Sequence, residues 1–133
     1  MLSHGPVEDR LAIRELAERY CDGINRFDAD VWGSTWAEDG AWFHANVRTE
    51  GREKIVASWL ESMEPFEATG FFCQMGGVQV DGDGATGRVY NHQIARKKDG
   101  QIVQGVYVYD DTYVKRDGRW LFKERLLTVP LFV

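Results

Sequence analysis

The chain has 133 residues, of which 44% are hydrophobic and 13% aromatic, and its formal net charge is −5 at pH 7. This length predicts one domain, residues 1–133, that is large enough to bury a core without disulfides or metals. The acidic balance argues against a nucleic-acid or anionic-membrane surface, because both need a basic patch. We therefore expect no nucleic acid and no membrane among its partners.

The first predicted element is a helix from about residue 6 to residue 26. Apolar residues recur along it every three or four positions and form one stripe: Ile13, Leu16, Tyr20, Ile24 and Phe27. Gly23 weakens the helix near its end, which indicates close packing or a bend there.

A short second helix follows, capped by Asp28 or Asp30. Trp32 and Trp36 lie one turn apart on it and should point the same way. The sequence Glu38-Asp39-Gly40 predicts the turn that ends this helix. A short strand over 41–45 pairs with 47–50, and a third helix then begins at Gly51 and ends at Pro65.

Asp-Gly pairs divide the second half of the chain into long stretches of aromatic and β-branched residues. Such pairs mark tight hairpin turns, in which both central residues need a positive φ. They predict four antiparallel strands at about 70–80, 85–96, 101–116 and 119–129. The sequence thus predicts an α+β fold in which three N-terminal helices cover a curved, cone-shaped antiparallel sheet. The cone has a mouth, so it can hold a hydrophobic small molecule.

The predicted strands are apolar on both faces, whereas an antiparallel sheet with one wet face alternates more strictly. The helices cover one face, and the chain has no further layer for the other. We therefore expect a homodimer that forms through the sheet face.

The cysteines and the N-terminus bear on cofactors and location. Cys21 and Cys73 show neither metal-ligand spacing nor a disulfide framework, so we expect inert thiols. The first residues lack the charged and apolar regions of a secretion signal, which favours a reducing, cytoplasmic location. We find no glycine-rich phosphate loop and no metal-ligand spacing, and we expect no cofactor and no metal.

Several motifs resemble those of SnoaL-like domains, which belong to the nuclear-transport-factor-2-like superfamily. The resemblance rests on Leu11-x-Ile13-x-x-Leu16-x-x-x-Tyr20, Asp28-x-x-x-Trp32, Trp36-Ala37-Glu38-Asp39-Gly40, Gly51-Arg52-x-x-Ile55, Gly105-x-x-x-Tyr109-x-Asp111-x-Tyr113, Asp117-Gly118-Arg119-Trp120 and Arg125. It implies the cone-shaped fold. It leaves the activity open, because this superfold hosts isomerases, dehydratases, dehydrohalogenases and non-catalytic subunits.

The resemblance also implies where catalytic groups should stand. Several lyases of the family pair an Asp at the end of the first helix with a His at the start of the first long strand, and an Arg on the last strand handles the departing anion. Here Asn25 stands at the Asp position, Phe71 at the His position, and Arg125 at the Arg position. The usual Asp–His pair is therefore missing.

Four side chains are candidates for catalysis. His92 has an imidazole, a side chain that can serve as acid or base, and it shares a strand face with Tyr90. Tyr20 has a phenol that can stabilise an oxyanion. Asp111 is either a base of raised pKa among aromatic rings or, as we favour, the partner of Arg125, the fourth candidate, or of Arg88 in an ion pair that lowers its pKa.

A second set is predicted to line the pocket, because these residues are aromatic, soft or able to orient a ligand. They are Asn25, Trp32, Trp36, Trp42, His44, Trp59, Phe71, Cys73, Met75, Tyr90 and Tyr109.

Two functions remain open. The first is a cofactor-free lyase or isomerase that acts by dehydration, elimination or proton shift on a hydrophobic cyclic or aromatic substrate. The second is a non-catalytic ligand-binding or scaffolding subunit, such as one resembling the small subunit of ring-hydroxylating dioxygenases. The missing Asp–His pair favours the second.

Overall fold

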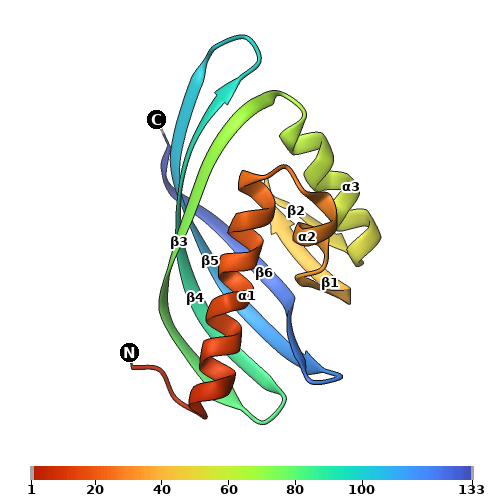
Figure 1. Cartoon of the computed structure of the whole chain (residues 1–133), viewed down its shortest axis with the longest axis vertical. Helices are drawn as coiled ribbons and strands as arrows, with labels where there is room; N and C mark the ends of the chain where they lie inside the picture. The colour runs from red at the N-terminus through yellow and green to blue at the C-terminus, as the bar shows by residue number, and fades with distance from the viewer. Residues whose placement is uncertain (1, 133) are drawn as a thin grey trace.

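The computed structural model describes residues 2–132. Its helices are α1 (Val7–Asn25), α2 (Ala29–Gly33) and α3 (Arg52–Met63), and its strands are β1 (Trp36–His44), β2 (Val47–Glu50), β3 (Phe66–Asp81), β4 (Gly84–Lys97), β5 (Ile102–Arg116) and β6 (Arg119–Phe132). The helix α1 lies along the concave side of a strongly curved sheet, with α2, α3 and the β1–β2 hairpin beside it (Figure 1). The predicted α+β cone, with helices on one face of a curved sheet, is confirmed.

The sheet is open and has the strand order β2-β1-β6-β5-β4-β3. The four long strands pair antiparallel as predicted, and β1 joins them through a parallel pairing with β6. At the β5–β6 turn, Asp117 and Gly118 have φ values of 52° and 75°. Both angles are positive, which is the geometry that the Asp-Gly signal predicts.

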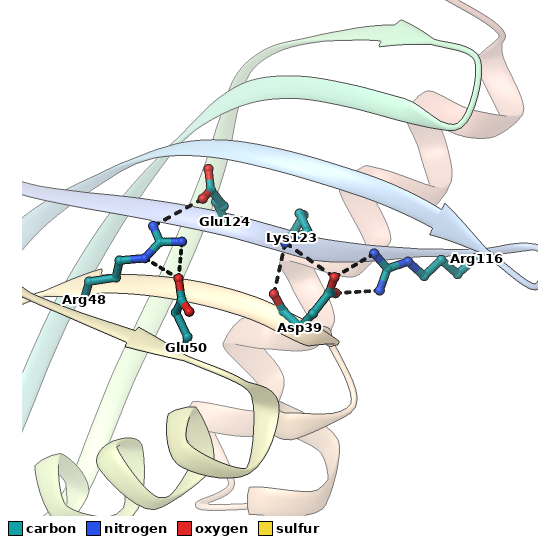
Figure 2. A network of polar contacts seen from close by, with 6 residues as sticks. All are labelled: Asp39, Arg48, Glu50, Arg116, Lys123 and Glu124. Carbon is teal, nitrogen blue, oxygen red and sulfur yellow. Dashed lines mark hydrogen bonds and ion pairs between the residues drawn. The ribbon is translucent and has the colours of Figure 1, made fainter.

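Ion pairs on the strand surfaces link the parallel part of the sheet (Figure 2). Arg116 Nη1 lies 2.6 Å from Asp39 Oδ1, and Lys123 Nζ lies 3.6 Å from Asp39 Oδ2. Further along, Arg48 Nη1 lies 3.3 Å from Glu124 Oε1. These pairs connect β1 and β2 with β5 and β6, but they are exposed, so each adds little to stability.

The boundary between α2 and β1 corrects two predictions. The helix α2 is capped by Asp28, whose Oδ1 accepts a hydrogen bond from Val31 N at 3.0 Å, but it ends at Gly33. Trp36 therefore begins β1 instead of lying on the second helix, and residues 38–40 continue the strand instead of turning. The register with β6 is irregular between Trp36 and Ala41, which is how a strand accommodates such a turn-like sequence.

The core between helices and sheet consists largely of aromatic rings. Trp32 stacks on Trp59 with centroids 4.7 Å apart, and Tyr20 meets Phe122 edge-on at 5.4 Å. A Cβ added at Gly23 would lie 2.8 Å from the backbone nitrogen of Trp32. The absence of a side chain at Gly23 thus allows the close contact of α1 and α2. The packed rings fill most of the cone.

Across residues 2–132, none of the helices is both long and apolar enough to cross a bilayer.

Candidate functional site

One pocket of about 200 Å³ remains open at the mouth of the cone. Helices α1 and α3 and strands β1, β3, β4, β5 and β6 all contribute to it. Its apolar side chains are Ile24, Trp42, Trp59, Met63, Phe66, Phe71 and Leu127, and its polar ones are Tyr20, His44, Ser62, Gln93, Tyr107 and Tyr109. Among these lining residues, only His44 ionises near neutral pH.

Two tyrosines and a tryptophan form a hydrogen-bonded group in the pocket wall. Tyr20 Oη and Tyr109 Oη lie 3.2 Å apart, and Trp42 Nε1 donates to Tyr109 Oη at 3.2 Å. Burial raises the pKa of both phenols, so they stay protonated at neutral pH. The pair holds two hydroxyl protons and consumes only one in its own hydrogen bond. The other can be donated to a ligand oxygen.

His44 is half-buried and lies against Trp42. The two rings stack with centroids 4.3 Å apart and an interplanar angle of 16°. Burial lowers the pKa of His44 from its usual value, which keeps the imidazole neutral at pH 7. A neutral imidazole can accept a proton, so His44 is the group of the pocket wall suited to act as a base.

Of the two partners predicted for Asp111, Arg125 forms the ion pair, whereas Arg88 pairs with Asp110. Arg125 Nε and Nη2 donate to the two Asp111 carboxylate oxygens at 2.7 and 3.0 Å, and the Tyr113 hydroxyl donates to Asp111 Oδ2 at 2.8 Å. The guanidinium carbon lies 3.8 Å from the centre of the Tyr109 ring and 4.0 Å from that of Phe122. The pair therefore sits behind the rings and is absent from the pocket lining.

The electrostatics of this pair differ from the sequence expectation. An ion pair should lower the pKa of Asp111, but burial raises it, and the contacts with Arg125 and Tyr113 only oppose that shift. For Arg125, burial favours the neutral form, yet Asp111 and Tyr20 raise its pKa above the usual range. Each carboxylate oxygen already accepts hydrogen bonds, so Asp111 is occupied as a structural partner.

The structure does not bring His92 or Tyr90 to the pocket. His92 is exposed and aligns with Phe72 and Val106 on the sheet face turned away from α1, which we call the outer face. Its Nε2 lies 2.8 Å from Gln104 Nε2. Tyr90 is also exposed and shares that face. The predicted sharing of a face is correct, but that face is the outer one.

The other predicted pocket residues divide between core and groove. Trp32 and Trp36 are fully buried behind the pocket. Cys73 and Met75 line a separate groove of about 700 Å³ that runs between α1 and β3. Of the predicted set, the pocket receives Tyr20, Trp42, His44, Trp59, Phe71 and Tyr109.

Sequence reasoning missed several lining residues, above all Gln93 and Tyr107. Both lie on the face of β4 and β5 that carries Tyr109, since strand residues two apart point the same way. The sequence analysis predicted His92 and Tyr90 at the site, and Gln93 points to the opposite face of β4. The signal that identifies it is its cross-strand partner Phe71, which the resemblance already placed at the site.

Within residues 2–132, no three His, Cys, Asp or Glu side chains gather as metal ligands do.

The chain matches a known protein family. The profile of the SnoaL-like domain matches residues 6–126. The chain belongs to the SnoaL-like domain family. No curated protein matches the chain.

Solved structures share the fold. A scytalone dehydratase-like protein from Novosphingobium aromaticivorans has a TM-score of 0.88 at 21% identity, covering 96% of this chain and 87% of its own. Hexachlorocyclohexane dehydrochlorinase LinA-type3 from Novosphingobium barchaimii has a TM-score of 0.81 at 19% identity, covering 96% and 90%. A protein of unknown function from Mycobacterium tuberculosis has a TM-score of 0.81 at 28% identity, covering 93% and 77%.

Within this SnoaL-like frame, Asn25 and Phe71 are joined to each other. Asn25 Nδ2 donates to the Phe71 carbonyl oxygen at 2.9 Å, and Phe71 N donates to Asn25 Oδ1 at 2.7 Å. The amide thus fastens the end of α1 to β3, and the Phe71 ring lies 6.2 Å from that of Tyr107. Two positions that the resemblance assigns to an acid–base pair here form a clamp and an apolar wall. Asn25 is not among the residues that line the pocket.

Proposed function

We propose that the pocket binds a compact, uncharged ring compound and that the protein performs cofactor-free lyase or isomerase chemistry on it. The size of the pocket carries the first part. A cavity of about 150 Å³ holds a benzene ring, so about 200 Å³ accommodates one six-membered ring with a few small substituents. Walls formed by Trp42, Trp59 and Phe71 suit a flat, apolar ring.

The pairing of a neutral imidazole with a free phenol proton supports the second part. His44 would take a proton from a carbon next to a carbonyl or a leaving group. The Tyr20–Tyr109 pair would donate a hydrogen bond to the oxygen on which negative charge develops. The names of two structural neighbours, a dehydratase-like protein and a dehydrochlorinase, describe eliminations, which begin with such a proton transfer.

Binding is tested by tryptophan fluorescence, because Trp42 and Trp59 line the pocket. Phenol and 2-cyclohexen-1-one should quench the emission saturably, whereas 2-naphthol, with two fused rings, should bind much more weakly. The variant Leu127→Trp, which fills the pocket, should abolish the response. Equal binding of naphthol would contradict the size argument.

Proton transfer is tested separately. In D₂O, the wild-type protein should accelerate deuterium incorporation next to the carbonyl of 2-cyclohexen-1-one, as followed by proton NMR. His44→Gln should retain binding and lose this exchange. If His44→Gln exchanges as fast as the wild type, His44 is not the base.

A second candidate function is non-catalytic ligand binding or scaffolding. It is favoured by the Asn25–Phe71 clamp, which stands where the resemblance implies an acid–base pair. Saturable binding of phenol by a wild-type protein that catalyses no exchange would support this candidate and exclude the first.

We further propose that a second copy of the chain covers the outer face. The described residues leave that face open, and large apolar side chains are exposed on it, with Phe72 at 61% and Leu131 at 55%. Phe72, His92, Val106 and Leu131 follow one another across four strands in register, so they form a continuous surface. Light scattering should find a dimer that Phe72→Glu dissociates, and a monomeric wild type would refute the proposal.

We also propose that the protein is cytoplasmic. Both cysteines are free thiols, as a reducing compartment leaves them.

A further inference from the structure

The two cysteines lie on neighbouring elements whose mutual register can be worked out. The helix α1 runs antiparallel to β3: His4, just before the helix, bridges Gln79, while Asn25 at its end is bonded to Phe71. A helix rises about 1.5 Å per residue and a strand about 3.3 Å. Two strand residues therefore match about four helix residues.

This register places the thiols opposite each other. Counting from the Asn25–Phe71 clamp, four residues back along α1 is Cys21, and two residues onward along β3 is Cys73. Asn25 and Cys21 share one helix face, and Phe71 and Cys73 share one strand face. Cys73 packs against the core cluster to which Cys21 belongs, in agreement with this placement.

The surroundings of the two thiols differ. Cys21 is buried, whereas Cys73 is half-buried and lines the open groove between α1 and β3 together with Arg14. The neighbouring Cys21 thiol, together with Arg125 and Arg14, lowers the pKa of Cys73 although burial opposes this. The same contact with Cys73, and then burial, raises the pKa of Cys21. Access from the groove thus favours Cys73 as the thiol that reacts first, and the direction of its pKa shift agrees with this order.

We propose that Cys73 and Cys21 form an oxidisable thiol pair that a low-molecular-weight disulfide, such as glutathione disulfide, converts into a bond between α1 and β3. The inference is independent of the pocket chemistry. It reverses the expectation from sequence that both thiols are inert.

The reaction proceeds in two exchanges. The Cys73 thiolate attacks one sulfur of glutathione disulfide, whose sulfur–sulfur bond breaks and releases one glutathione thiolate. Cys21 then gives up its proton to solvent and attacks the Cys73 sulfur, which expels the second glutathione. The protein loses two electrons and two protons, and glutathione disulfide gains them. Once Cys73 is in the mixed disulfide, its thiolate no longer opposes ionisation of Cys21.

The test compares the wild-type protein with Cys21→Ser and Cys73→Ser after incubation with glutathione disulfide. Intact-mass analysis should show the wild type lighter by two hydrogen atoms and without an alkylatable thiol. Cys21→Ser should stop at a stable mixed disulfide, and Cys73→Ser should react at least tenfold more slowly. The proposal is overturned if the wild type stops at the mixed disulfide or if Cys73→Ser reacts as fast as Cys21→Ser.

A second measurement does not depend on the variants folding. Peptide mapping of wild-type protein trapped at early times should find glutathione on the Cys73 peptide before the Cys21–Cys73 crosslink appears. Glutathione first on the Cys21 peptide, or a crosslink between two chains, would overturn the proposal. The crosslinked protein should also melt at a higher temperature than the reduced protein, because the bond constrains the unfolded chain.

Discussion

The closed centre of the cone and its open mouth use polar groups in opposite ways. At the centre, Asp111 and Arg125 bind each other through two hydrogen bonds, and Tyr113 adds a third. At the mouth, His44 stacks on Trp42, and the Tyr20–Tyr109 pair keeps a spare hydroxyl proton. The charged residues that look most catalytic in the sequence thus stabilise the fold, while neutral groups remain free for a ligand.

The largest effect is expected from Asp111→Asn. This change leaves the buried Arg125 guanidinium without its counter-charge, which should cost about 3–5 kcal/mol of unfolding free energy. Urea unfolding measures the loss. The neighbouring change Asp110→Asn is the matched control, since Asp110 pairs with Arg88 on the exposed side of the same strand and should have little effect. Equal losses in the two variants would show that burial does not distinguish them.

A smaller loss is expected from Asn25→Leu, which keeps the side-chain volume and removes both hydrogen bonds to Phe71. Leaving the Phe71 amide and carbonyl unpaired should cost about 1–3 kcal/mol. Asn25→Asp retains the acceptor and loses the donor, so its stability should fall between those of the wild type and Asn25→Leu. A variant Asn25→Leu as stable as the wild type would mean that the clamp is dispensable.

The His44→Gln variant should affect proton exchange strongly and stability weakly, the reverse of Asp111→Asn. The pH dependence gives a further test. Burial lowers the pKa of folded His44, so the unfolded chain binds more protons as the pH falls below the unfolded value of about 6.5. The wild type should therefore lose stability relative to His44→Gln below that pH. Above it, the two stability curves should run parallel, and a difference that grows with rising pH would contradict the assignment.

The smallest effect is expected from Asp39→Asn on the sheet surface (Figure 2). A hydrogen bond from Arg116, assisted by Lys123, lowers the pKa of Asp39 to about 2 although burial opposes this. Its contribution is therefore present above pH ~4 and is lost as the pH falls toward 2. Solvent screening keeps it small, and salt should reduce it further. Urea midpoints of the two proteins at low and high salt measure the difference, and a loss comparable with that of Asp111→Asn would be inconsistent with a screened pair.

The fold was largely predictable because its signals are local. The Asp-Gly pairs fixed the long hairpins, and the stripe containing Tyr20 fixed α1. The turn predicted at residues 38–40 was wrong because these residues continue strand β1. The position of β1 is set by its pairing with β6, which lies far away in the sequence. Tertiary pairing overrode the local preference there.

The candidate site was less predictable, since it depends on which face of each strand is concave. Trp42 and His44 were both predicted to line the pocket and do so, whereas His92 was predicted on β4 and its neighbour Gln93, on the opposite strand face, lines the pocket instead. Because side-chain direction alternates with a period of two residues, an error of one residue becomes a complete reversal of faces. The volume of the pocket was also not predictable, because it depends on how the aromatic rings pack in the folded protein.

The central claim is that ligands bind at the mouth, beside His44. It is tested most directly by recording the imidazole resonances of His4, His44 and His92 during a titration with phenol. We predict a saturable shift of the His44 signals alone, lost in Leu127→Trp, while His4 and His92 stay unchanged. A shift of His92 with His44 unaffected, or no saturable shift at all, would contradict the account.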